Sequence, residues 1–232
     1  MQNRLVRLLA ELRELLLYGS FSRRSYAQEG EDLILDRIFG ASTTGFYVDI
    51  GAHHPVRFSN TFLFYKRGWH GICIDPSPDT AKLFKKVRPR DIALEMGISD
   101  CEKSLTYIVF DEPALNTFSE ELADQRVKQT SYQIVDKRQV LVYPLSKVLD
   151  EFLIDKSSID FMTIDVEGLD LEVLRSNNWN KYRPRCVLAE ALSDGVGNSI
   201  REFMQGVDYK CIARTFNTEF YIDNRFESEA VH

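Results

Sequence analysis

Short apolar runs alternate with amphipathic segments along the chain after residue 27. This alternation is typical of a mostly parallel sheet with helices on both faces. A closing antiparallel pair of strands would complete a Rossmann-like seven-stranded sheet, an α/β fold whose C-terminal strand is antiparallel. We expect strands over residues 45–51, 70–75, 92–98, 159–165, 185–190, 209–213 and 219–222. We expect helices over residues 59–67, from Pro78 onward, 120–128, 145–152, 168–174 and 200–204.

The stretch between the third and fourth of these strands is the least regular part of the chain. Residues 104–110 alternate and predict an extra strand or a loop edge, and residues 111–138 are polar and mixed. The segment 110–118, with Asn116 and Thr117, could touch a substrate. We interpret it instead as a solvated connector.

The first 24 residues predict an extra amphipathic helix. Its leucines fall at helical spacing, and charged residues form the opposite stripe. The segment is too interrupted by charge for a signal peptide or a membrane span. We expect this helix to cover its own domain or a dimer mate, with peripheral membrane contact as the alternative. No repeat or Pro/Gly/Ser-rich linker divides the rest, so we expect a single domain over 25–232.

Composition and charge narrow the classes of partner. With 44% hydrophobic and 28% charged residues among 232, the chain is neither disordered nor fibrous. Its net charge of -6 has the wrong sign for binding a phosphate backbone, so we expect no nucleic-acid partner. The four cysteines are scattered without a CxxC pair, and we interpret all of them as reduced core or near-core residues of a cytoplasmic protein.

Four predicted strands end in acids, and such ends meet at the ligand-binding edge of a parallel sheet. The acids are Asp49, Asp75, Asp165 and Glu190. The turn Asp49-Ile-Gly-Ala lets a ligand approach the backbone, and Asp75 is placed to accept both hydroxyls of a ribose. Because the G-x-G-x-x-G fingerprint is missing, an adenosine without a pyrophosphate fits best.

Several ordered blocks resemble the FkbM family of class I S-adenosylmethionine-dependent methyltransferases, over roughly residues 25–192. The blocks lie at 25–32, 48–52, 59–61, 68–71, 74–76, 97–100, 144–146 and 159–168. One departure is His53-His54-Pro55, where many members have Asn after the Gly-Ala. The resemblance implies an enzyme that transfers a methyl group from S-adenosylmethionine to a hydroxyl of a sugar, glycan or secondary metabolite.

The resemblance also assigns site residues. Asp49, Gly51 and Ala52 would line the methionine end of the cofactor, and Asp75 would hold the ribose. Asp165 would face the sulfonium and the acceptor, with Glu167 supporting its turn. The other cofactor-binding candidates are Gln28 and Glu31 in a cover, Asn60 and Pro76 in their blocks, and Ile98, Ser99 and Asp100 beside the adenine.

Methyl transfer to a hydroxyl also requires removal of a proton. His53 or His54 could serve as the base near neutral pH, and an equally good interpretation of either is a structural loop histidine. Asp165 and Glu190 could instead hold a divalent cation such as Mg²⁺ that acidifies the hydroxyl. The metal ligands therefore stay unassigned.

Two other classes of function are open at this point. One is a non-catalytic cofactor-binding or interaction module of the same fold. The other is a nicotinamide-dependent oxidoreductase, which the missing glycine fingerprint disfavours.

Overall fold

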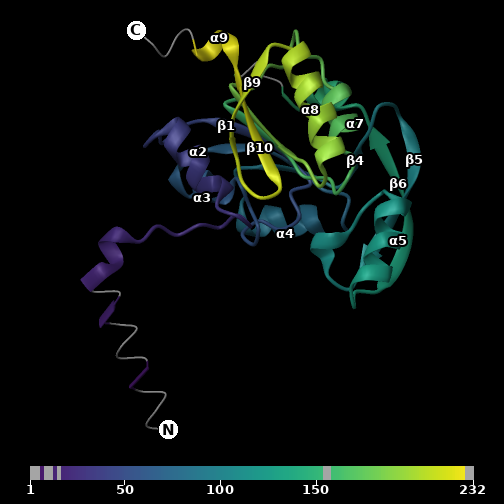
Figure 1. The fold of residues 1–232 in the computed structure, drawn as a ribbon, viewed down its shortest axis with the longest axis horizontal. Helices are drawn as coiled ribbons and strands as arrows, with labels where there is room; N and C mark the ends of the chain where they lie inside the picture. Colours follow the sequence, from purple (N-terminus) through teal and green to yellow (C-terminus); the bar gives the residue numbers. More distant parts are fainter. Residues whose placement is uncertain (1–5, 8–12, 15–16, 154–157, 228–232) are drawn as a thin grey trace.

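A seven-stranded sheet forms the centre of the protein in the computed structural model, which describes residues 6–7, 13–14, 17–153 and 158–227 (Figure 1). Its strand order is β3-β2-β1-β7-β8-β10-β9. Strand β10 runs antiparallel to both neighbours, and every other neighbouring pair is parallel. The predicted Rossmann-like sheet is therefore confirmed. Its strands are β1 (Phe46–Ile50), β2 (His70–Ile74), β3 (Ile92–Leu94), β7 (Phe161–Ile164), β8 (Cys186–Glu190), β9 (Tyr209–Arg214) and β10 (Thr218–Asp223).

Helices cover both faces of this sheet, as predicted. Successive side chains of a strand point to opposite faces, so Val48 packs in the core under α6, α7 and α8 while Tyr47 packs under α2, α3 and α4. Figure 1 shows α2 and α3 on the side of the sheet opposite α7 and α8. These helices are α2 (Glu31–Phe39), α3 (Phe62–Arg67), α4 (Thr80–Val87), α6 (Leu145–Phe152), α7 (Asp170–Arg175) and α8 (Asp194–Gly206). A short α9 (Asn224–Glu227) follows β10.

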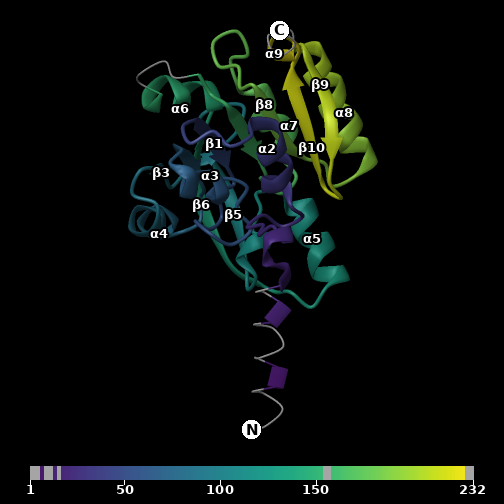
Figure 2. The same cartoon turned by 90° about the vertical axis from the view of Figure 1, so that its left-hand side faces the viewer.

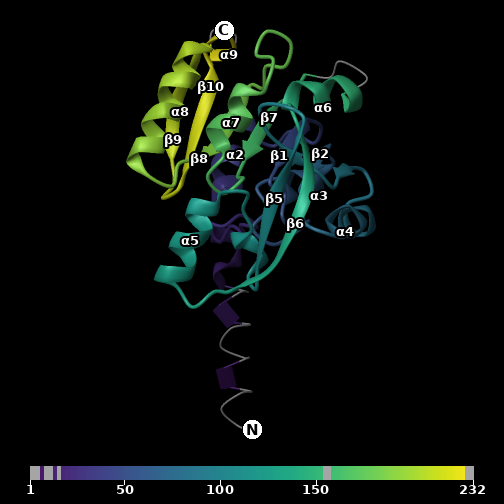
Figure 3. The same cartoon turned by 90° about the vertical axis from the view of Figure 1, so that its right-hand side faces the viewer.

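Residues 97–143 form a second layer of structure, which we call the insertion. It contains a three-stranded sheet of β4 (Gly97–Ile98), β6 (Ile134–Tyr143) and β5 (Lys103–Phe110), with η2 (Pro113–Leu115) and α5 (Glu120–Gln129) between β5 and β6. Strands β5 and β6 run side by side in Figure 3. Figures 2 and 3 show α5 at the end of the molecule from which the N-terminal segment leaves.

The insertion corrects two expectations. The single strand expected over 92–98 is divided, because β3 joins the main sheet while β4 pairs with β6. A Cβ on Gly97 would lie 2.7 Å from the Val142 side chain, so any larger residue would force a neighbour in the insertion to move. Strand β6 was not predicted; most of its side chains are exposed or half-buried, and its pairing with β5 spans long sequence separations.

Other differences are smaller. Helix α2 was not predicted, and α8 extends well beyond the expected 200–204. Cys73 and Cys186 are buried, but Cys101 and Cys211 are exposed, so the core interpretation was wrong for those two.

The leucine stripe of the first helix lies mostly outside the described residues. The described part includes η1 (Gly19–Phe21), whose segment extends away from the sheet in Figure 1. Within the part of the chain that the structure describes, no helix is both long and apolar enough to span a bilayer.

Candidate functional site

A hollow of about 740 Å³ lies at the carboxyl ends of the parallel strands. We call it the main hollow; this volume includes the open space at its mouth. Its wall is built by the loops after β1, β2 and β7 and by the insertion. Eight of the predicted site residues line it, namely Gln28, Gly51, His53, Asp75, Pro76, Ile98, Asp165 and Glu167.

The turn after β1 brings two strand ends into contact. Gly51 has a φ of +83°, and a Cβ there would lie 1.7 Å from the carbonyl oxygen of Asp165. Its N–H donates to the Ile74 carbonyl oxygen at 2.9 Å. Glycine is therefore required by backbone conformation and by space, and it exposes main chain to the hollow.

Asp75 is held rigidly in the wall beside this turn. Its two carboxylate oxygens accept the backbone N–H groups of His53 and Ser77, both at 2.8 Å. Each oxygen keeps a further lone pair, because a carboxylate has about four acceptor positions. The side chain can therefore accept two hydroxyl groups from a ligand.

The opposite wall is apolar and comes largely from the insertion. The rings of Tyr107 and Phe118 have centroids 4.8 Å apart, and Ile98 lines the same side. Asn116 and Thr117 are 7% and 1% exposed, so interpreting this segment as a solvated connector was wrong. Tyr107 and Met96 were missed as site residues, because an aromatic residue in a strand, such as Tyr107, more often signals core than a ligand site. Phe118 belongs to the segment that was interpreted as a connector.

A second hollow of about 280 Å³ adjoins the first, and we call it the acidic hollow. Gln28, Phe58 and Asp165 line both. The carboxylate of Glu29 accepts the backbone and side-chain N–H groups of Asn217, which fixes the β9–β10 turn over this space. The other lining residues are Glu31, Asn60, Glu190 and Thr218.

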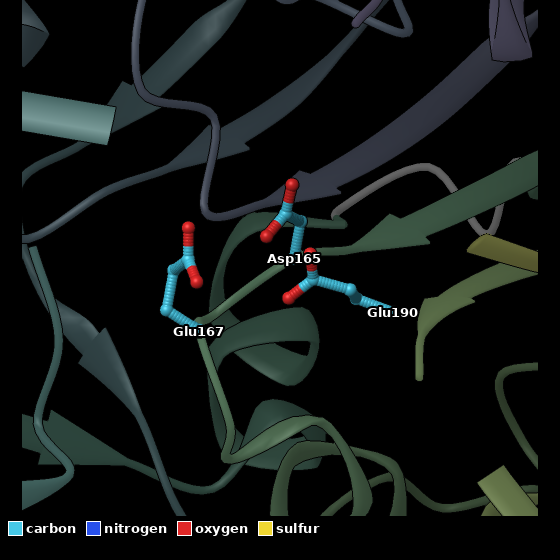
Figure 4. A group of neighbouring side chains, drawn as sticks. All are labelled: Asp165, Glu167 and Glu190. Atoms are coloured by element: carbon cyan, nitrogen blue, oxygen red, sulfur yellow. The ribbon is translucent and has the colours of Figure 1, made fainter. Parts of the chain in front are cut away.

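Three carboxylates gather where the two hollows meet. Asp165, Glu167 and Glu190 each offer an oxygen, and these atoms lie within 4.8 Å of one another (Figure 4). Burial, followed by the charge of neighbouring carboxylates, raises the pKa of Asp165 and of Glu190 well above the usual range. Glu190 is only 8% exposed, and its Oε2 has no hydrogen-bond partner among the described residues.

The loop that carries Glu167 is strained and tied to the insertion. Glu167 and Gly168 have φ values of 56° and 101°, an uncommon conformation for a glutamate. The Thr117 hydroxyl donates to the Glu167 carbonyl oxygen at 2.8 Å, and Arg126 forms an ion pair with the Glu167 carboxylate. Arg126 was missed at the sequence level, because a contact with a residue 41 positions away has no local signal.

The two histidines differ in what they can do. His53 faces the main hollow, and its Nε2 is buried without a hydrogen-bond partner among the described residues. Burial lowers its pKa, which favours the neutral imidazole that a base requires. The Nδ1 atom of His54 instead accepts the N–H groups of Val56 and Arg57, both at 3.0 Å, so His54 stabilises its own turn.

Several predicted cofactor residues line neither hollow. The Asp49 carboxylate accepts the Thr61 hydroxyl at 2.6 Å, and burial raises its pKa to about 6. Ser99 bonds to Glu172 on α7, and Asp100 is exposed and pairs with Lys103 at 2.7 Å. Ala52 and His54 are likewise absent from both linings.

Comparisons with known proteins identify the family of the chain. Residues 49–211, well over half of the chain, match the family described as the methyltransferase FkbM domain. A TehB-like SAM-dependent methyltransferase from Corynebacterium glutamicum aligns with 97% of this chain and 100% of its own, at 10% identity and a TM-score of 0.39. No curated protein matches the chain. From the family match over the core of the sheet and its loops, the chain belongs to the FkbM family of S-adenosylmethionine-dependent methyltransferases.

Proposed function

We propose that this methyltransferase acts on oxygen, transferring the methyl group to a hydroxyl of a sugar, glycan or secondary metabolite. The observation that carries the proposal is the meeting of the two hollows at Asp165. The main hollow has the mixed apolar and polar wall that a nucleoside needs. The acidic hollow is lined by carboxylate and amide groups, which suit a ligand rich in hydroxyls.

The residues of the main hollow fit S-adenosylmethionine. Asp75 would accept the ribose hydroxyls, and Pro76, Ile98 and Tyr107 would contact the adenine. The bare backbone at Gly51 leaves room for the methionine end, since a side chain there would strike Asp165. The unpartnered Nε2 of His53 is a buried polar atom that still requires a hydrogen bond.

The geometry favours fewer cofactor-binding residues than the sequence predicted. Glu31 and Asn60 line the acidic hollow, so we place them near the acceptor. We assign Asp49 to the interior of the sheet, where it meets Thr61, and Ser99 and Asp100 to the junction with α7. Ala52 contributes its backbone N–H to the Ile74 carbonyl oxygen at 3.1 Å.

The bound cofactor supplies an electrophilic methyl group on a sulfonium, and the chain supplies position and a proton acceptor. Orientation of two reactants contributes much of such a rate enhancement. His53 is the better base of the two histidines, because His54 Nδ1 is engaged by its own turn. A divalent cation such as Mg²⁺, expected from Asp165 and Glu190, is the second way to make the hydroxyl acidic.

We also propose that residues 25–232 act as one methyltransferase domain and that residues 1–24 mediate assembly. The terminal segment has the charge pattern of an amphipathic helix, and removing it would change either self-association or membrane contact. Mass measurement and liposome flotation of the full chain and a 25–232 variant separate these two roles. Unchanged behaviour in both assays would contradict a role for the segment.

Calorimetry followed by an acceptor panel tests the proposed function. We expect S-adenosylmethionine to bind the full chain, NADH to show no binding, and hydroxyl compounds to gain a methyl group. Methylation confined to nitrogen or sulfur acceptors would overturn the assignment to oxygen. Binding of the cofactor without turnover of any acceptor class would favour a non-catalytic module.

A further inference from the structure

We propose that Asp165, Glu167 and Glu190 bind one divalent cation of the oxygen-preferring class at the junction of the two hollows. The proposal that a cation binds rests on these side chains and does not depend on the proposed function. The part played by the cation in catalysis rests on the proposed function.

Geometry is the first argument. The three ligand oxygens lie within 4.8 Å of one another, and the centre of such a triangle is about 2.8 Å from each corner. Small side-chain rotations bring that distance to the roughly 2.0–2.6 Å of Mg²⁺ and Ca²⁺ ligands. Figure 4 shows the carboxylate groups of Asp165 and Glu190 close together and that of Glu167 across from them.

The buried carboxylate of Glu190 is the second, independent argument. Its residue is 8% exposed, and its Oε2 has no hydrogen-bond partner in the described part of the chain. A buried polar oxygen without a hydrogen-bond partner destabilises the folded state, and such oxygens are rare in native proteins. A cation between the three carboxylates would supply the missing partner.

Charge balance points the same way. Three ionised carboxylates carry a charge of about −3, and the Arg126 guanidinium on Glu167 compensates one unit. A divalent ion would therefore neutralise the cluster without requiring protonation of its members.

The position of the cation would link it to methyl transfer. Asp165 lines both hollows, so an acceptor hydroxyl reaching the donor would pass beside the cation. A cation lowers the pKa of a bound hydroxyl. The hydroxyl proton then leaves to His53 or solvent, the oxygen–methyl bond forms, and the sulfur–methyl bond breaks.

Manganese binding tests the site without any methyl donor. Paramagnetic resonance on the full chain should show one bound Mn²⁺ that Mg²⁺ or Ca²⁺ displaces. Glu190→Gln keeps the shape of the side chain and should weaken Mn²⁺ binding at least tenfold. The control Glu102→Gln, at an exposed carboxylate paired with Lys147, should leave binding unchanged.

Two results would overturn the site: no bound Mn²⁺ at millimolar concentration, or equal affinity in wild type and Glu190→Gln. Asp165→Asn serves as a second ligand variant if Glu190→Gln does not fold. S-adenosylmethionine titration of the same samples distinguishes the proposals. Cofactor binding without Mn²⁺ binding would overturn only the cation site, whereas Mn²⁺ binding without any O-methylation would overturn only the proposed function.

Discussion

Asp75→Asn replaces one carboxylate oxygen of the proposed cofactor site by an NH₂ group and keeps the shape of the side chain. Both carboxylate oxygens of Asp75 already accept a backbone N–H, from His53 and Ser77 at 2.8 Å. An amide has one acceptor oxygen, so the NH₂ group of the asparagine must face one of these N–H groups. The same NH₂ group cannot accept a hydrogen bond from a ribose hydroxyl. A hydrogen bond to a charged group contributes about 1.5–3 kcal/mol. The affinity for S-adenosylmethionine should therefore fall about 10- to 150-fold.

Isothermal titration calorimetry of wild type and Asp75→Asn measures this loss. Asp79→Asn is the matched control, because its side chain is 72% exposed and pairs with Lys82 on the surface. Circular dichroism and thermal unfolding should show both variants folded. An affinity within twofold of wild type in a folded Asp75→Asn protein would refute the ribose assignment.

Three further substitutions test the turn, the interior acid and the base. Gly51→Ala should lower the melting temperature and abolish cofactor binding because its Cβ would meet the Asp165 carbonyl oxygen, whereas Gly195→Ala, in open space on α8, should not. Asp49 has a folded-state pKa raised to about 6, so its contribution to stability is present below pH 4 and is lost as pH rises through 6. In urea unfolding, the free energy of unfolding of wild type should therefore fall by up to about 3 kcal/mol relative to that of Asp49→Asn between pH 4 and 8. A difference in unfolding free energy between the two proteins that does not change with pH would contradict this. His53→Gln should lower kcat with little change in cofactor affinity, while His54→Gln should mainly lower thermal stability; equal kcat for His53→Gln and wild type would exclude His53 as the base.

The sheet and its acidic edge could be predicted because both follow from local patterns. Asp75, Asp165 and Glu190 stand at or directly after buried strands, and parallel strands bring such positions to one edge. The strand order then places Asp165 and Glu190 on neighbouring strands, β7 and β8. No knowledge of tertiary contacts was needed for this part of the site.

The rest of the site depends on contacts that no local pattern encodes. Arg126 reaches Glu167 only because β6 pairs with β5 and places α5 beside the β7 loop. Ser99 and Asp100 turn toward α7 because β4 leaves the main sheet for the insertion. Asp49 lies inside β1 on the same face as Tyr47, so the alternation of strand side chains turns it toward Thr61 and away from the hollow; its partner 12 residues away is what the local pattern does not show.

Oxygen-directed methyl transfer is the central claim, and one measurement tests it most directly. The full chain would be incubated with S-adenosylmethionine carrying a deuterated methyl group and with a mixture of sugars, glycans and small hydroxyl metabolites. Mass spectrometry and NMR should find the label as a methyl ether on an acceptor oxygen, in amounts that fall for Asp165→Asn. Label found only on nitrogen, sulfur or carbon, or absent from every product, would contradict the account.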